Sequence, residues 1–124
     1  MLAAAKGNAR LALHVYFGDP TPVLDRLLAS PADIVGLDFT YSPGLVDRLA
    51  AARPRKALGL GLLDGRNTKL EEPAAVLRML DRILPQVQAE ECYLTPSSGL
   101  EYLPRDRALE KLKRLVAIRD QAVH

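Results

Sequence analysis

The sequence lacks the residues and segments that several classes of protein require. It has one cysteine, Cys92, in 124 residues, which excludes an intramolecular disulfide framework and zinc sites built from two or more cysteines. No apolar run approaches the roughly 18 residues of a membrane span. The first residues, Met1–Lys6, are too short and too mixed for a signal peptide. We therefore expect a cytoplasmic protein without a membrane partner.

An excess of charge of one sign is also missing. Seventeen Lys and Arg face 15 Asp and Glu, which leaves a formal charge of +2. Basic residues gather between Arg105 and Arg119, but Asp106, Glu110 and Asp120 are mixed among them at spacings that suit ion pairs on a helix. This pattern favours a solvated helix face over a phosphate-binding patch, and it predicts no nucleic-acid partner.

The sequence does contain a repeated unit, a short apolar run followed by an apolar stripe at helical spacing. The runs predict four buried strands, over residues 11–17, 34–39, 56–63 and 91–95. Each of the helices that follow is predicted to begin beside a proline, which fits the first helical turn. These prolines are Pro22, Pro43, Pro73 and Pro104.

Two further details of the helices can be predicted. Thr21 and Ser42 each precede a proline and are expected to cap the helices that follow. The last helix is expected to turn an apolar side inward. That side consists of Leu109, Leu112, Leu115 and Val116.

Consecutive strand and helix units with apolar strands predict an α/β fold with a parallel sheet covered by helices. A complete (β/α)8 barrel needs eight units and about 250 residues, so four units correspond to half of one. We interpret residues 1–124 as a single (βα)4 half-barrel whose first and fourth strands leave open edges. Gly59 and Gly61, two residues apart in the third strand, indicate a close approach, either by a ligand or within a crowded barrel wall.

Polar residues follow the predicted strands, where parallel α/β folds place their chemistry. His14 and Tyr16 share one face of the first strand, and Asp38 ends the second. A buried carboxylate needs a partner, for which a neighbouring histidine or a metal is the natural choice. His14 could equally be a hydrogen-bonded core residue. Ser97 and Ser98 complete the set after the fourth strand.

The segment Asp64–Asn67 after the third strand has two interpretations. It could be a turn in which Arg66 pairs with Asp64, because Asp-Gly favours turns. Extended to Lys69, it could instead belong to an unrelated α/β protein that binds a phosphate or nucleotide. No complete glycine-rich phosphate motif supports the second interpretation.

Several segments together resemble a known family. Residues Thr95–Arg105 read Thr-Pro-Ser-Ser-Gly-Leu-Glu-Tyr-Leu-Pro-Arg, similar to Asn-Pro-Asp-Cys-Gly-Leu-Lys-Thr-Leu-Pro-Arg of the cobalamin-independent methionine synthases. Residues 11–19 resemble that family's strand with His-x-Cys, residues 33–38 its strand ending in glutamate, and residues 60–64 its Gly-x-Gly-Val-x-Asp strand. On these motifs the chain resembles the C-terminal half of the family's catalytic barrel.

The resemblance implies a methyltransferase acting on a homocysteine-like thiol, with a methylated folate as donor and zinc as cofactor. The family's zinc ligands, one His, two Cys and one Glu, fall on His14, Tyr16, Ser98 and Asp38. Only His14 is identical, and hydroxyl groups ligate zinc poorly, so the resemblance implies a zinc centre that is altered or lost. The alternative is a noncatalytic half-barrel or fragment. In either case we expect a homo-oligomer or a partner barrel half.

Overall fold

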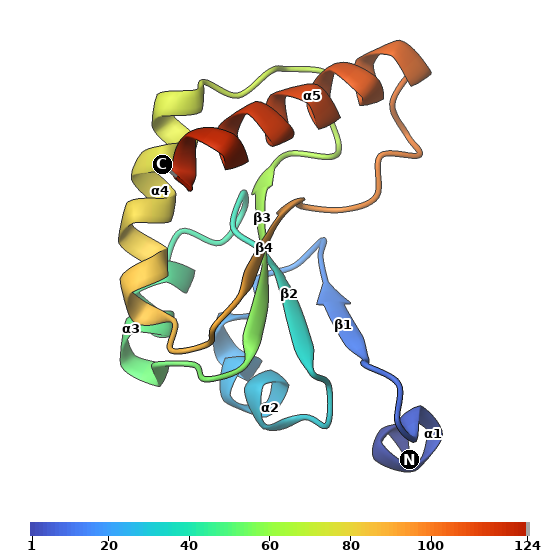
Figure 1. Ribbon diagram of the computed structural model, residues 1–124, viewed down its shortest axis with the longest axis vertical. Helices are drawn as coiled ribbons and strands as arrows, with labels where there is room; N and C mark the ends of the chain where they lie inside the picture. Colours follow the sequence, from blue (N-terminus) through green and yellow to red (C-terminus); the bar gives the residue numbers. More distant parts are fainter. Residues whose placement is uncertain (124) are drawn as a thin grey trace.

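The computed structural model describes residues 1–123 and has one parallel sheet with the strand order β1-β2-β3-β4. The strands pair in chain order, so β1 and β4 are outermost. Figure 1 shows β1 at one side of the sheet and β4 crossing in front of β3. The predicted α/β class and the four successive βα units are therefore confirmed. The two open edges lie on the first and last strands, as expected.

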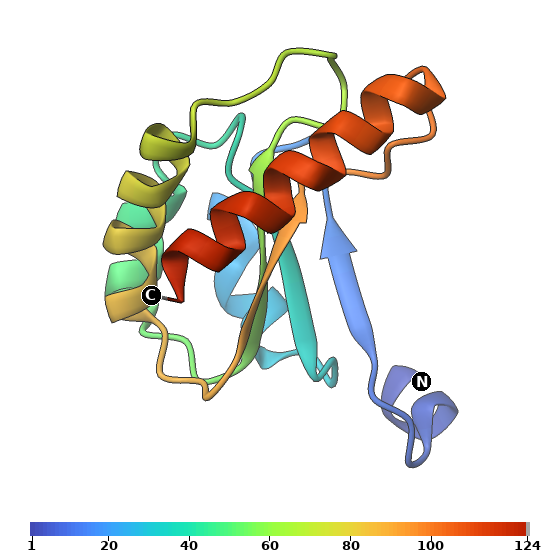
Figure 2. The ribbon, with the colours of Figure 1, turned by 45° about the horizontal axis from the view of Figure 1, so that its top comes forward.

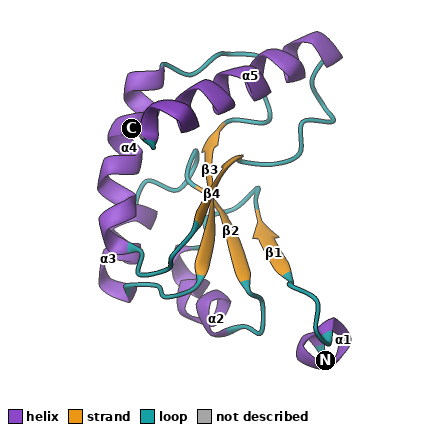
Figure 3. Ribbon diagram, in the orientation of Figure 1, coloured by secondary structure: helices purple, strands orange, loops and turns teal. Residues whose placement is uncertain are grey.

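The elements follow the predicted order, with shorter strands than expected at some ends (Figure 3). The strands are β1 (Ala12–Val15), β2 (Ile34–Asp38), β3 (Ala57–Leu63) and β4 (Cys92–Pro96). The helices are α1 (Leu2–Lys6), α2 (Leu24–Ala29), α3 (Leu45–Ala52), α4 (Pro73–Ile83) and α5 (Arg105–Ala122), with 3-10 turns at Thr21–Val23 and Leu84–Gln86. Within residues 1–123, no helix is both long enough and apolar enough to span a membrane.

The predicted caps at Thr21 and Ser42 are wrong. Asp19 organises the first turn instead. Its Oδ1 accepts hydrogen bonds from the backbone N–H (3.0 Å) and from the side-chain hydroxyl (2.5 Å) of Thr21. A 3-10 turn follows, and α2 begins only at Leu24. The hydroxyl of Ser42 is buried without a hydrogen-bond partner in the described residues, and α3 begins at Leu45 without a side-chain cap.

Helices cover one face of the sheet. Alternate strand residues such as Val35, Leu37 and Leu58 are completely buried against Leu24 and Leu45 of the helices. In Figure 2 the helices α2 to α5 gather on one side of the strands. This layer forms the hydrophobic core.

Within residues 1–123 no helix covers the opposite face, and we call it the helix-free face. Register places His14 beside Gly36, Gly36 beside Gly59, and Gly59 beside Tyr93. Side chains in register point to the same side of a sheet. The face also includes Asp38, Gly61 and Thr95, which are in register with one another. Tyr16 lies on it too, and its ring makes a T-shaped contact with the ring of His14. The rings of Tyr16 and Tyr93 are 46% and 38% exposed.

The glycines of β3 are required by the approach of neighbouring backbone. A Cβ added at Gly59 would lie 3.1 Å from the Cα of Gly36. A Cβ at Gly61 would lie 2.7 Å from the carbonyl oxygen of Leu37 and 3.0 Å from the Cα of Ser97. Separations under 3 Å are not tolerated without movement of the backbone. The interpretation of this strand as a crowded wall is thus confirmed.

Helix α5 does not turn the expected side inward. Leu109, Leu112 and Val116 are 51%, 45% and 43% exposed, and only Leu115 of the predicted set packs against the core. The buried residues are Lys111 and Ile118. The prediction is wrong because the ammonium of Lys111 has partners inside the protein, which fixes the rotation of the helix.

Candidate functional site

The carboxyl ends of the strands carry a network of polar side chains. Asp38, the last residue of β2, has no exposed surface. Its Oδ1 accepts hydrogen bonds from the backbone N–H (2.8 Å) and hydroxyl (2.5 Å) of Thr40. Its Oδ2 accepts one from Nη2 of Arg66 at 3.1 Å. The buried carboxylate is therefore satisfied within the chain.

Arg66 joins the ends of β2 and β3. Besides Asp38, its guanidinium contacts Oδ1 of Asp64 through Nε at 3.3 Å. The guanidinium carbon lies 3.7 Å from the centre of the Tyr41 ring and 4.9 Å from that of Phe17. Such stacking orients the planar cation. We call Asp38, Thr40, Tyr41, Asp64 and Arg66 the rim cluster.

The rim cluster confirms one expectation and overturns another. Arg66 pairs with Asp64 in an Asp-Gly turn, as one interpretation of this segment predicted. The partner of Asp38 is Arg66, however, and not His14 or a metal. Arg66 lies three residues beyond the end of β3, from where its long side chain can reach across to Asp38, and this spacing was the available signal.

Asp64 is held as a carboxylate by several donors. Its oxygens accept hydrogen bonds from the backbone N–H of Arg66 (2.9 Å), the hydroxyl of Tyr41 (2.8 Å) and the amide of Asn67 (3.0 Å). Burial by itself raises the pKa of Asp64, but the hydrogen bonds from Arg66 and Tyr41 outweigh it and lower the pKa below its ordinary value. The group is ionised at neutral pH.

Lys111 of α5 anchors the loop that follows Asp64. Its side chain is 1% exposed, and Nζ donates to the carbonyl oxygen of Asp64 (2.5 Å), Oδ1 of Asn67 (3.3 Å) and Oε1 of Glu71 (3.2 Å). Glu71 in turn accepts from the backbone N–H of Asp64 at 2.9 Å. The sequence analysis missed this role. The signal was the spacing of Ala108, Lys111, Leu115 and Ile118 along one side of α5.

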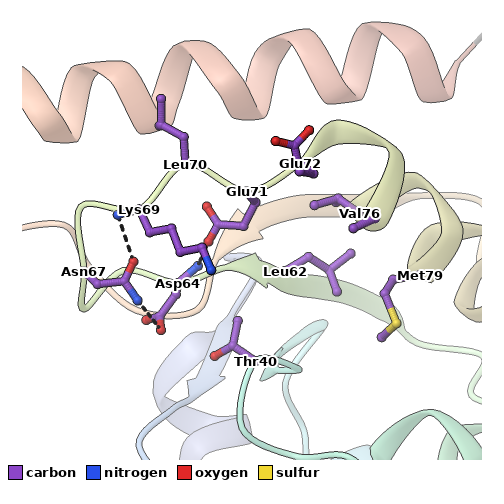
Figure 4. A pocket seen from close by; sticks show the side chains of 11 residues that line it. Thr40, Leu62, Asp64, Asn67, Lys69, Leu70, Glu71, Glu72, Val76 and Met79 are labelled. Atoms are coloured by element: carbon purple, nitrogen blue, oxygen red, sulfur yellow. Dashed lines mark hydrogen bonds between the residues drawn. The ribbon is translucent and has the colours of Figure 1, made fainter.

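A cleft with a volume of about 510 Å³ opens between this loop and α4. Figure 4 shows Asp64, Asn67 and Lys69 on its polar side. Val76 and Met79 lie on its apolar side. Of the predicted site residues, the cleft includes Asp64 and Asn67 but not His14, Tyr16 or Ser98.

His14 lies on the helix-free face, with its ring against Gly36. A Cβ on Gly36 would lie 2.7 Å from Cδ2 of that ring, so the histidine fills the space above the glycine. The ring makes no hydrogen bond within residues 1–123 and remains exposed at its edge. Burial lowers the pKa of His14 below its ordinary value, and the charge of nearby Asp38 opposes the shift. The imidazole is therefore neutral at pH 7.

Ser98 is buried at the end of β4, away from the exposed ring of His14. Its hydroxyl donates to the carbonyl oxygen of Gly99 at 3.3 Å and packs beside Gly65, where a Cβ would lie 2.6 Å from Oγ. Ser97 is also buried, and its Oγ accepts the N–H of Gly65 at 3.1 Å. Both serines thus fix the loop after β3. Cys92, at the start of β4, packs against the core, and burial raises the pKa of its thiol.

The four positions predicted for zinc do not fit a tight zinc site. The carboxylate of Asp38 is already engaged by Thr40 and Arg66. Tyr16 and Ser98 offer hydroxyl groups, which are poor ligands for zinc. Within residues 1–123, no three His, Cys, Asp or Glu side chains lie close enough together to hold a metal ion. Zinc binding at His14, Tyr16, Asp38 and Ser98 stays a prediction, and we derive no chemistry from it.

Comparison with known proteins assigns the family. The model of the cobalamin-independent synthase N-terminal domain matches residues 1–88. The chain belongs to the cobalamin-independent synthase family. The identification with the C-terminal half of the catalytic barrel is wrong, because the matching model describes the N-terminal domain. The segment Thr95–Arg105, on which that identification most depended, lies outside the matched residues.

Individual relatives agree with the family. A methionine synthase from Methanothermobacter marburgensis is 31% identical over 107 residues, covering 86% of this chain and 34% of that protein. A 5-methyltetrahydropteroyltriglutamate-homocysteine methyltransferase from Chelativorans sp. (strain BNC1) is 36% identical over 110 residues, covering 86% of this chain and 14% of that protein. The chain spans about a third of the length of the first curated relatives it matches.

A solved structure confirms the fold. The B12-independent methionine synthase from Shewanella sp. W3-18-1, in complex with selenomethionine, superposes with a TM-score of 0.76. The superposition covers 97% of this chain and 42% of that one, at 22% sequence identity. The four βα units therefore match part of a domain of a methionine synthase.

Proposed function

We propose that the helix-free face, together with the rim cluster, forms half of a substrate-binding surface for methyl transfer from a methylated folate to a homocysteine-like thiol. The observation that carries the proposal is His14, which lies on an exposed sheet face at the strand ends without a hydrogen-bond partner in the described residues. Membership of the cobalamin-independent synthase family supports the reaction class.

The chemistry of such a site would depend on the thiol proton. A thiol has a pKa near 8.5, so it is mostly protonated at pH 7, and only the thiolate is an effective nucleophile. The neutral imidazole of His14 is available to accept that proton. The thiolate sulfur then forms a bond to the methyl carbon, the bond from that carbon to the donor nitrogen breaks, and the nitrogen takes up a proton.

The test is the melting temperature of the chain with and without homocysteine and 5-methyltetrahydrofolate. A ligand at about 100 times its Kd stabilises the folded state by about 2.7 kcal/mol, which raises the melting temperature. We expect a rise for the unaltered chain and a smaller one for His14→Ala, because the ring contacts the ligand.

Arg82→Ala is the matched control, since Arg82 lies on the outside of α4 and is 58% exposed. We expect this variant to respond to the ligands like the unaltered chain. If neither homocysteine nor 5-methyltetrahydrofolate changes the melting temperature of the unaltered chain, the proposal is contradicted.

A noncatalytic assembly unit is the second candidate. It is favoured by Arg66, which neutralises Asp38 with a cation of the chain itself. This candidate predicts self-association without any response to homocysteine or folate.

A further inference from the structure

The two outer strands of the sheet are covered less well than the inner ones. On the helix-facing side, Val35 of β2 and Leu58 of β3 have no exposed surface. Their neighbours in register, Leu13 of β1 and Cys92 of β4, are only partly buried. Both edges therefore leave apolar side chains and backbone hydrogen-bonding groups open to another strand.

Helix α5 exposes apolar side chains along one flank. Leu109, Leu112 and Val116 follow one another at intervals of three and four residues, which aligns them on the helix surface. We call these three residues the edge stripe. Arg114, on the other flank, donates to the carbonyl oxygen of Glu71 just before α4. The edge stripe therefore faces away from α4, on the side where a barrel would continue.

The amino ends of the two edge strands carry opposite charges. Arg10 precedes β1, whereas Glu90 and Glu91 precede β4, and all three are exposed. Within one chain Arg10 forms an ion pair with Glu91, although β1 and β4 are separated by two strands. The two edges thus carry charges of opposite sign, and in a pair of copies Arg10 of one could exchange Glu91 of its own chain for Glu91 of the other.

We propose that a second copy of this chain closes the sheet into an eight-stranded barrel, with β4 of each copy pairing in parallel with β1 of the other. Four strands from each copy match the number in a closed (β/α)8 barrel. The pairing joins the basic edge to the acidic edge at both junctions. Pairing of β1 with β1 or of β4 with β4 would instead bring like charges together.

The edge stripe gains a partner in this arrangement. In a (β/α)8 barrel the helix that follows β4 packs between β4 and the next strand. Its neighbour in the outer ring is the helix that follows that next strand. In the closed pair that neighbour is α2 of the second copy. Val23, immediately before α2, is 44% exposed and offers an apolar surface there.

The inference rests on the proposed function in one respect, since the second copy would supply the other half of the same binding surface.

The first test exchanges charges at the edges. Sedimentation of the unaltered chain should give twice the 13.6 kDa of one chain. Arg10→Glu alone and the double change Glu90→Arg with Glu91→Arg each place like charges at both junctions, so each should sediment mainly as single chains. An equal mixture of the two variants has opposite charges at both junctions and should recover the doubled mass. Circular dichroism of each variant checks that it is folded.

The second test addresses the edge stripe. Leu112→Asp and Val116→Asp should shift the population towards single chains, because the new charge meets the apolar surface of the partner. Ala117→Asp makes the same change at an exposed position of α5 outside the stripe, and it should keep the doubled mass.

Three results would overturn the inference. The unaltered chain could sediment as a single chain at every concentration, it could form assemblies larger than two copies, or the mixed charge variants could stay apart. None of these measurements needs a ligand. A failure to dimerise is therefore distinguishable from a failure to bind homocysteine or folate.

Discussion

At the scale of single residues, Arg66 determines the chemistry of the strand ends. Asp38 is completely buried, and a buried carboxylate without a counter-charge is costly. Arg66 supplies that charge, while Asp64 and the ring of Tyr41 hold the guanidinium in place. His14 is consequently left free of the carboxylate. The partly covered imidazole of His14 and the buried ion pair of Asp38 with Arg66 are thus two separate features at the carboxyl ends of the strands.

Tyr41→Phe tests the hydrogen bonds around Asp64. The ring that stacks on Arg66 is kept, but the hydroxyl that donates to Asp64 is lost. We expect a small loss in the free energy of unfolding at pH 7, because Tyr41 is 57% exposed and water competes for this hydrogen bond. Tyr102→Phe is the matched control, because Tyr102 is 71% exposed, and it should change the stability by less than about 0.5 kcal/mol.

The effect of Tyr41→Phe should depend on pH. The pKa of Asp64 is lower in the folded chain than its ordinary 3.8. The stabilisation is therefore fully present above pH 3.8, and it is lost as the pH falls through the folded pKa. Urea unfolding should show the variant and the unaltered chain converging in acid. A difference that stays constant from pH 7 down to acid unfolding would show that Asp64 is not involved.

At the scale of elements, α5 is attached to the sheet by a polar anchor as much as by apolar packing. Lys111 is buried and hydrogen-bonded to the loop after β3, and Ile118 packs against the core about two helical turns further along α5. The helix thereby holds the loop that carries Asp64 and Arg66. Its apolar edge stripe remains on the outer flank.

Lys111→Met should reveal the strength of this anchor. The methionine keeps most of the side-chain volume, but Glu71 and the carbonyl oxygen of Asp64 lose their partner. We expect a loss of about 3 kcal/mol in the free energy of unfolding, measured by urea titration. Lys113→Met, an exposed position on the same helix, should cost less than about 0.5 kcal/mol. Equal effects of the two variants would mean that the anchor contributes nothing.

The elements could be predicted from the sequence more reliably than their contacts. The strand β3 was predicted to within one residue, because seven consecutive buried residues leave a continuous apolar run. The inward side of α5 and the partner of Asp38 could not be predicted in the same way. Both depend on long side chains, Lys111 and Arg66, that reach residues far away in the sequence. Apolar periodicity does not record such contacts.

At the scale of the whole molecule, the glycines of β3 allow the strands to approach closely and the sheet to curve. The backbone of β2 and the segment after β4 both come against Gly61. Such crowding at one residue links three strands. The shape of the half-barrel therefore depends on the absence of a side chain at this position.

Gly61→Ala tests this dependence. The added Cβ would lie 2.7 Å from the carbonyl oxygen of Leu37, so strands must move apart. We expect a loss of about 1–3 kcal/mol in the free energy of unfolding. Gly44→Ala is the control, since no atom lies within 4 Å of its Cβ position, and it should be neutral or stabilising by up to about 1 kcal/mol. A Gly61→Ala variant as stable as the control would contradict the crowding.

The order of the strands in the sheet also governs how the chain can fold during its synthesis. Every parallel pair joins strands that are successive in the sequence. Each pair still requires the crossover helix between its two strands, so the pairing is sequential but not local in the chain. Each βα unit can therefore dock onto the one before it as the chain leaves the ribosome, and no strand has to wait for a later one to be inserted beside it.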